Sequence, residues 1–105
     1  MREQAVSEAV LSPSDVDAAL EDQQLHWRHE GDEITTTVKL HDFVAALEFV
    51  HAVGAAAEAA NHHPDIDIRW DTVTLRLTTH SAGGLTQKDI ALAVEIDRLL
   101  EQGVA

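Results

Sequence analysis

The chain has 105 residues, 45% of them apolar and 25% charged, so it can bury one hydrophobic core and we expect a single domain over residues 1–105. Nineteen acidic residues against seven Lys and Arg give a formal charge of −12, which repels phosphate backbones and disfavours direct nucleic-acid binding. The absence of cysteine excludes disulfides, thiolate nucleophiles and Cys-based zinc sites.

No targeting segment is apparent in the sequence. The first ten residues, MREQAVSEAV, contain two glutamates and no apolar run, so they predict no signal peptide. The longest stretch nearly free of charge, around residues 50–57, is too short to cross a bilayer and lies between Glu48 and Glu58. We therefore expect a cytoplasmic protein that does not associate with membranes.

The first elements are a helix and a hairpin. Residues 11–22 predict a helix of about two turns, because Ser12 or Ser14 can cap it and Pro13 suits its first turn. Residues 25–29 and 34–40 predict two strands on either side of the turn EGDE. In the second strand the even-numbered residues share one face.

A long amphipathic helix is predicted for residues 42–60. Its apolar positions recur at helical spacing, namely Phe43, Leu47, Val50, Gly54 and Ala57, with Ala46 and Val53 beside them. Asn61 is a plausible C-terminal cap, and Pro64 keeps His63 out of the helical conformation.

A second hairpin and a final helix complete the chain. Strict alternation in DIDIRW predicts a strand with Ile66, Ile68 and Trp70 facing inward, and a tight WDT turn leads to the next strand, VTLRLTTH. After the glycine loop SAGGL, Thr86 and Asp89 form a capping-box pattern that begins the last helix. The apolar face of this helix comprises Leu92, Ala93, Ile96, Leu99 and Leu100.

The order of elements, α-β-β-α-β-β-α, predicts an α+β fold. We expect a four-stranded antiparallel sheet with the two long helices packed on one face and a short N-terminal helix. Such a sheet leaves two strand edges open, and the wide apolar face of residues 92–100 also needs a cover. Self-association through sheet edges or through the final helix is therefore expected, as a homodimer or a homotetramer.

Three histidines lie where elements end and loops begin. His62 and His63 follow the long helix and His80 ends the last strand, so all three are expected to be accessible to solvent. The other four histidines fall on exposed positions, His26, His29, His41 and His51.

Several chemistries are open to these histidines. A metal triad is disfavoured, because adjacent side chains such as His62 and His63 point in different directions. Nucleophilic catalysis lacks a nucleophile, since Ser81 has no recognisable elbow around it. Proton transfer suits imidazole, which titrates near neutrality. From the spacing alone, proton transfer and simple exposure to solvent remain equally open.

Three segments resemble one known family, the pterin-4a-carbinolamine dehydratases. EAANHHPDI is similar to its Glu-x-x-x-His-His-Pro signature, and TTHSAGGLTQKDIALA resembles its second motif, a Thr-His pair before a Gly-Leu-[Ser/Thr] turn and a helix. The upstream LHWRHEGDEITTTVKLHDFVAALEFV also matches, so the resemblance covers about residues 11–100. The family fold agrees with the α+β arrangement expected above.

The resemblance implies an enzymatic activity. Family members dehydrate 4a-hydroxytetrahydropterins, left by aromatic amino-acid hydroxylases, to quinonoid dihydropterins, and so recycle tetrahydropterin without a metal or an organic cofactor. By resemblance, His62 and His80 are proton-transfer residues on opposite faces of the pterin ring, while His63 holds substrate or shares the acid role. Some members also act as dimerisation cofactors of a homeodomain transcription factor, and others are assembly chaperones without the histidines. A non-catalytic interaction role is therefore the alternative.

The resemblance also implies a substrate-binding set. Glu58 would orient an imidazole or bind the amino-pyrimidine edge of the pterin, and Asp89 would raise the basicity of His80 or cap the last helix. At Ile66 many members carry an aromatic residue, so apolar contact remains but ring stacking is lost. The other residues expected to contact pterin, partly through backbone groups, are Asn61, Pro64, Thr79, Ser81 and Ala82.

Overall fold

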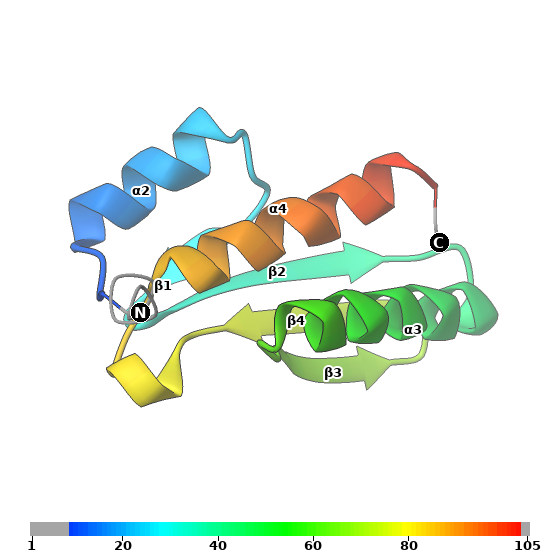
Figure 1. Cartoon of the computed structure of the whole chain (residues 1–105). Helices are drawn as coiled ribbons and strands as arrows, with labels where there is room; N and C mark the ends of the chain where they lie inside the picture. Colours follow the sequence, from blue (N-terminus) through cyan, green and yellow to red (C-terminus); the bar gives the residue numbers. More distant parts are fainter. Residues whose placement is uncertain (1–8, 104–105) are drawn as a thin grey trace.

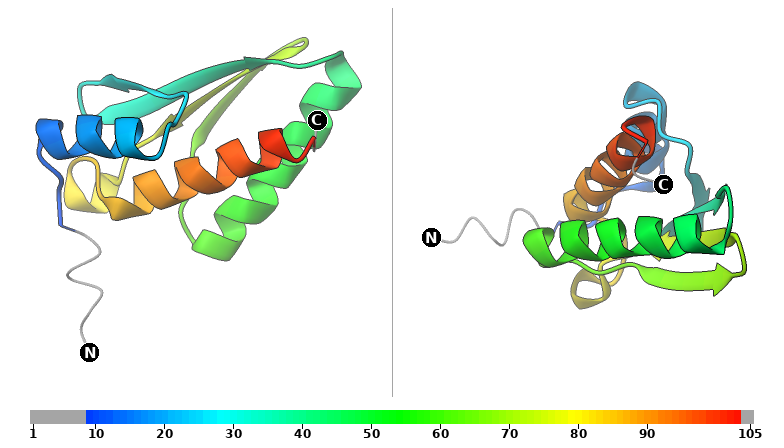
Figure 2. Two further views of the ribbon diagram at one scale, coloured as in Figure 1. Left: turned by 90° about the horizontal axis from the view of Figure 1, so that it is seen from above. Right: turned by 90° about the vertical axis from the view of Figure 1, so that its right-hand side faces the viewer.

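A computed structural model describes residues 9–103 as a four-stranded antiparallel sheet with its helices on one face, which confirms the predicted α+β fold (Figures 1 and 2). The N-terminal residues for which no signal peptide was predicted lie almost entirely outside the described part. Spatially the strands run in the order β1-β2-β4-β3. Along the chain the elements are α2 (Pro13–Asp22), β1 (Arg28–Glu30), β2 (Glu33–Lys39), α3 (Phe43–Ala60), β3 (Asp65–Arg69), β4 (Thr72–Leu77), the 3-10 turn His80–Ala82 and α4 (Gln87–Glu101).

The helices begin where the sequence places capping residues. Ser12 caps α2 by accepting the Asp15 N–H, and Asp42 caps α3 by accepting the Ala45 N–H. Thr86 and Asp89 form the predicted capping box at the start of α4. These side chains satisfy N–H groups that have no partner inside the first turn of a helix. The predicted helix starts are therefore confirmed to within two residues, whereas the first strand, predicted at residues 25–29, lies at Arg28–Glu30.

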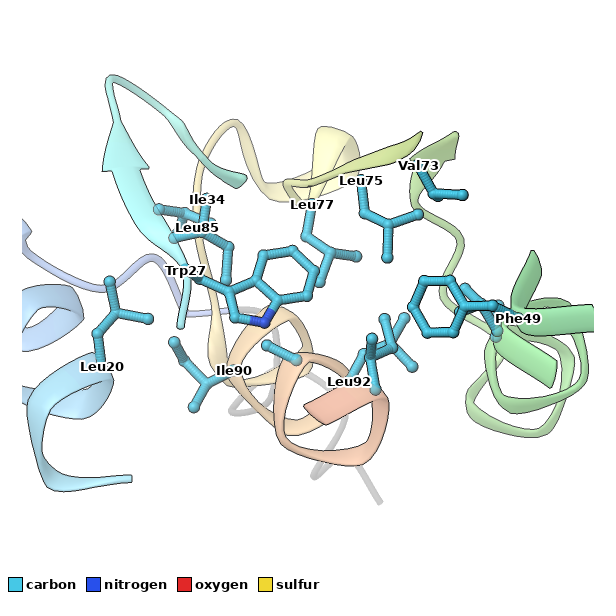
Figure 3. Close-up of a cluster of buried hydrophobic side chains, with 14 of the residues drawn as sticks. Leu20, Trp27, Ile34, Phe49, Val73, Leu75, Leu77, Leu85, Ile90 and Leu92 are labelled. Atoms are coloured by element: carbon cyan, nitrogen blue, oxygen red, sulfur yellow. The ribbon is translucent and has the colours of Figure 1, made fainter. Parts of the chain in front are cut away.

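The core lies between the sheet and the helices (Figure 3). Val73, Leu75 and Leu77 are fully buried, as their alternation along β4 predicts, and Phe49 of α3 packs in the same cluster. A buried polar contact joins the two ends of the fold, because Trp27 Nε1 donates to Asp97 Oδ1 of α4 at 2.8 Å. This contact fixes the chain leading into β1 against the last helix.

The prediction that β3 turns three large side chains inward is wrong for Trp70, while Ile66 and Ile68 face inward as predicted but are not buried. Ile66, Ile68 and Trp70 are 39%, 37% and 74% exposed. Ile66 and Ile68 lie opposite Leu75 and Val73 and so face the helices, but β3 is an edge strand that pairs only with β4, and the helices leave this edge partly open. Trp70 belongs to the turn between β3 and β4, with φ at +57°, so the alternation of the strand does not reach it.

The buried face of α3 includes the predicted Ala46, Val53 and Ala57 but otherwise differs from the predicted one. The helix buries Ala45, Ala46, Phe49, Val53 and Ala57. Phe43 and Leu47, predicted to be on the apolar face, are 47% and 44% exposed. Apolar residues surround most of this helix, so their spacing alone does not select the side that meets the sheet. Small alanines next to Phe49 allow the close approach that decides it.

The apolar face of α4 serves the protein's own core. Leu92, Ala93 and Ile96 are buried, while Leu99 and Leu100 are half-buried. Apart from Val10 before α2, the large apolar side chains left exposed lie instead on α3 and on and beside β3. An open apolar face on the final helix, expected above as one route to self-association, is therefore not present in the described residues.

One helix in the described part of the chain, α3, is long and apolar enough to cross a membrane by length and composition, with a mean hydropathy of 1.4 over 18 residues. The uncharged stretch within it, between Glu48 and Glu58, is shorter than that. In the structure α3 packs on the sheet and contributes Phe49 and Val53 to the hydrophobic core. It therefore belongs to the globular fold.

An ion pair between β2 and the β3–β4 turn makes stability depend on pH. Lys39 Nζ donates to Asp71 Oδ2 at 2.6 Å, and this hydrogen bond is the main cause that holds the pKa of the Asp71 carboxyl below its usual value. Because the pKa is lower in the folded protein, the pair stabilises the fold above about pH 4, and the contribution is lost as the pH falls through the folded pKa.

We expect Lys39→Met to lower the free energy of unfolding at pH 7 but to make little difference once Asp71 is protonated. Urea unfolding of both proteins at pH 7 and at about pH 2.5 measures this gap. A gap of equal size at both pH values would contradict the assignment.

Candidate active site

The candidate site begins where α3 ends. Asn61 adopts the left-handed conformation, with φ at +53°, and the His62 N–H bonds back to Ala57 O at 3.1 Å. This closure is common at helix C-termini and turns the chain sharply before Pro64. It carries His62 toward the start of α4, while His63 remains on the surface.

His62 forms a buried pair with Asp89. Its Nε2 lies 2.6 Å from Asp89 Oδ1, and the two side chains are 10% and 0% exposed. The expectation that His62 is accessible to solvent is therefore wrong. Asp89, expected to act on His80 or to cap the last helix, caps α4 and is hydrogen-bonded to His62 instead of His80. Asp89 lies in the first turn of α4, in the same capping box that the sequence predicts, and it bonds the other histidine.

Two threonines complete the surroundings of Asp89. Its Oδ2 accepts the Thr79 hydroxyl at 2.7 Å and the Thr86 N–H at 2.9 Å, and the two threonine hydroxyls are 2.8 Å apart. The sequence predicts Thr86 only as a helix cap. The alternation along the last strand could have revealed this cluster, because Thr79 continues the inward-facing series of Val73, Leu75 and Leu77.

His63 has a different environment. Its Nε2 lies 2.6 Å from Glu58 Oε2, with the two side chains 56% and 79% exposed. Glu58 thus orients an imidazole, one of its two predicted roles. Exposed ion pairs of this kind add little stability. The Glu58 contact therefore holds the His63 ring less firmly than the buried Asp89 contact holds the His62 ring.

His80 is exposed and begins the 3-10 turn after β4. The turn is closed by the Thr79 N–H to Gly84 O at 3.1 Å and by the Ala82 N–H to Thr79 O at 3.0 Å. Gly83 follows with φ at +80°, a conformation that favours glycine. The N–H groups of Thr79 and Ala82 are therefore used within the turn, and Ser81 lies exposed between His80 and Ala82.

The histidines border two separate hollows. His62 lines a cavity of about 420 Å³ between α3 and α4, whose wall contains four alanines together with Leu92, Lys88 and Glu95. His80 lines a second hollow of about 350 Å³ beside Thr78, Gly83 and Gly84. Asp89 connects the His62 ring to the segment that carries His80, because it bonds both this ring and Thr79, the residue before His80.

The remaining residues of the predicted set lie around this linkage. Asn61 and Pro64 flank the two adjacent histidines, and Ile66 is partly exposed on β3. Within residues 9–103, no group of three or more His, Asp or Glu side chains comes together as a metal site. The arrangement thus offers one buried, oriented imidazole and two exposed ones, which is suited to proton transfer.

The fold and these residues define a class of protein, an α+β domain with paired histidines after one helix and a third histidine before the next. The family model for pterin 4 alpha carbinolamine dehydratase matches residues 9–99. The chain belongs to the pterin-4-alpha-carbinolamine dehydratase family.

Individual relatives agree with this placement. A protein of Nocardia farcinica, provisionally named pterin-4-alpha-carbinolamine dehydratase, is 54% identical over 90 residues, covering 86% of this chain and 94% of its own. The crystal structure of a transcriptional coactivator/pterin dehydratase from Brucella melitensis superposes with a TM-score of 0.80 at 30% identity, covering 86% of this chain and 97% of its own. A pterin dehydratase-like RuBisCO assembly factor of the alpha-carboxysome shares the fold, with a TM-score of 0.61 at 21% identity over 73% of this chain and 92% of its own.

Proposed function

We propose that this protein is a 4a-hydroxytetrahydrobiopterin dehydratase, a hydro-lyase that converts a 4a-hydroxytetrahydropterin to the quinonoid dihydropterin. The observation that carries the proposal is the buried His62–Asp89 pair, which is hydrogen-bonded to Thr79, the residue preceding His80. Family membership supports the same reaction. The whole chain would act as a single catalytic domain.

The reaction requires two proton movements. The hydroxyl on C4a leaves as water once it accepts a proton, and N5 gives up its proton as the quinonoid double bond forms. The net change is the loss of one water molecule, with no change in oxidation state. A base and an acid each accelerate such a step by about 10²–10⁴-fold.

His62 is assigned as one of these groups. A carboxylate accepts hydrogen bonds only, so Asp89 Oδ1 holds the hydrogen on His62 Nε2. The proton exchanged with substrate is then carried by Nδ1. His80, on its exposed turn, is assigned to the opposite face of the pterin ring.

The other residues contribute to substrate binding. His63, oriented by Glu58, would contact the pterin or share the acid role. Ile66 offers an apolar side chain without ring stacking, which affects the preference for the pterin side chain. The rest of the proposed set comprises Asn61, Pro64, Thr79, Ser81, Ala82 and Asp89, of which Thr79 and Asp89 have side chains buried beneath His62.

No cofactor is required by this chemistry, which gives a direct test. We expect purified protein to accelerate dehydration of a 4a-hydroxytetrahydropterin equally well with and without EDTA, because the proton-transfer groups are side chains. Stopped-flow absorbance measures the rate. Activity that is lost with the chelator and restored by zinc would contradict the proposal and favour a metal enzyme.

We also propose that the protein works in the cytoplasm as a homodimer or homotetramer, without direct contact to nucleic acid or membranes. The open edge of β3 supports self-association, since Ile66 and Ile68 are partly exposed there. The other sheet edge, β1, has three residues and exposes Arg28 and Glu30, features that protect an edge from pairing.

An assembly or interaction role is the alternative. The fold also occurs in a carboxysomal assembly factor, although at 21% identity that likeness concerns the fold alone. The presence of His62, His63 and His80 in one chain favours the enzyme. A protein that folds and self-associates but leaves the dehydration rate unchanged would favour the interaction role.

A further inference from the structure

We propose that Thr79 and Thr86 are positioning residues that hold Asp89 in one orientation and thereby keep His62 in its Nε2–H tautomer. The inference concerns the same site, and its kinetic consequence rests on the proposed function. The tautomer itself can be observed without any enzymatic assay.

The hydrogen bonds beneath His62 have a fixed direction. The Thr79 hydroxyl has one hydrogen, and it donates this to Asp89 Oδ2 at 2.7 Å. The contact of 2.8 Å between the two hydroxyls must then carry the hydrogen of Thr86 toward Thr79. Thr86 Oγ1 in turn accepts the Lys88 N–H at 3.2 Å. The chain of donors therefore runs from the start of α4 through both threonines to the carboxylate.

Because these groups are buried, this series of hydrogen bonds sets the orientation of the Asp89 carboxylate. Asp89 and Thr86 are 0% exposed and Thr79 is 2% exposed, so bulk water does not compete for these atoms. Oδ2 already accepts two hydrogen bonds, which leaves Oδ1 for the imidazole at 2.6 Å. Nδ1 of His62 has no partner within residues 9–103, so it is the nitrogen that can serve a ligand.

The contacts exceed what a helix cap needs. A capping box requires the side chain and the N–H of Thr86 together with the carboxylate of Asp89. Thr79 belongs to the other segment, directly before His80, and its hydroxyl adds nothing to the cap. Removing this hydroxyl alone thus separates the orientation of Asp89 from the stability of α4.

Valine has nearly the shape of threonine without the hydroxyl, so Thr79→Val is the test and Thr79→Ser the matched rescue. Proteins labelled with ¹⁵N-histidine are compared by NMR at about pH 8.5, above the range in which imidazole usually titrates. The His62 signal is assigned from its absence in His62→Gln. Circular dichroism shows whether each variant is folded.

We expect the wild-type His62 ring to be protonated at Nε2, and Thr79→Val to shift part of the population to Nδ1–H. The valine variant should lower kcat about 10-fold, the lower end of the range for residues that orient a functional histidine, with KM changed less than about twofold. Thr79→Ser should restore the Nε2–H tautomer and the wild-type kcat. As a control, Thr37→Val removes a threonine hydroxyl that contacts Thr74 at 3.1 Å in the sheet and should change neither.

Two results would overturn the inference: a wild-type His62 protonated at Nδ1, or a folded Thr79→Val protein with an unchanged spectrum and an unchanged kcat. If Thr79→Val does not fold, Thr86→Val removes the preceding link and is judged by the same spectrum. A spectral shift in a protein without dehydratase activity would sustain the positioning role and reject the proposed function. An active wild type whose His62 is protonated at Nδ1 would reject the positioning role and sustain the proposed function.

Discussion

Replacing both proton-transfer histidines is expected to abolish dehydration while leaving the protein folded. The variant we favour is His62→Gln with His80→Ala, because glutamine keeps a donor near Asp89. His62→Ala would leave a fully buried carboxylate without its 2.6 Å partner, at a cost of about 1–3 kcal/mol in stability. His80 is exposed, so alanine suffices there.

Each single replacement should lower kcat by about 10²–10⁴-fold, and the double variant should fall to the uncatalysed rate, because each histidine serves one face of C4a. His63→Ala should raise KM more than it lowers kcat. His51→Ala, an exposed residue on α3 away from these contacts, is the matched control and should behave as the wild type. Rates are measured by stopped-flow absorbance on proteins with native circular-dichroism spectra. A folded double variant that dehydrates the carbinolamine at the wild-type rate would reject the histidine mechanism.

The fold could be predicted because the local sequence patterns at each helix and strand were consistent with one arrangement. Capping residues marked the helix starts, and alternation placed Val73, Leu75 and Leu77 in the core. The predictions that were wrong concern features that tertiary packing determines. Alternation in β3 cannot reveal that the strand lies at an edge, and apolar residues all around α3 do not say which side meets the sheet.

The candidate site was predicted in part. The sequence motif brought His62, His63 and His80 forward as a group, and the capping box identified Asp89 as a structural residue. Which histidine Asp89 bonds depends on how the end of α3 meets the start of α4, residues 27 positions apart, and no local pattern contains that information. The same meeting buries His62, although it follows a helix end where exposure is the usual outcome.

Self-association at the β3 edge is expected to be lost when a charge is placed there. Ile68, on the helix-facing side of β3, is 37% exposed, and Ile68→Lys would put an ammonium group into an apolar contact. In a symmetric dimer each change occurs twice. Only the exposed part of each isoleucine is left to bury on association, which is worth about 0.5–1 kcal/mol per copy, so the two lost contacts weaken association by about 5–30-fold, and the cost of desolvating the lysine ammonium groups adds to this.

Lysine is chosen so that a loss of association cannot be explained by stronger charge repulsion between copies. The chain carries a formal charge of −12, so an added positive charge reduces repulsion between copies and by itself would favour association. Thr37→Lys, on an exposed position of the central strand β2, is the control with the same change of charge. Sedimentation equilibrium at micromolar concentration should give the wild type and the control at least twice the chain mass of 11.5 kDa, and Ile68→Lys the mass of one chain. A wild type that sediments as one chain would reject the interface, and an Ile68→Lys protein that stays assembled would move it away from β3.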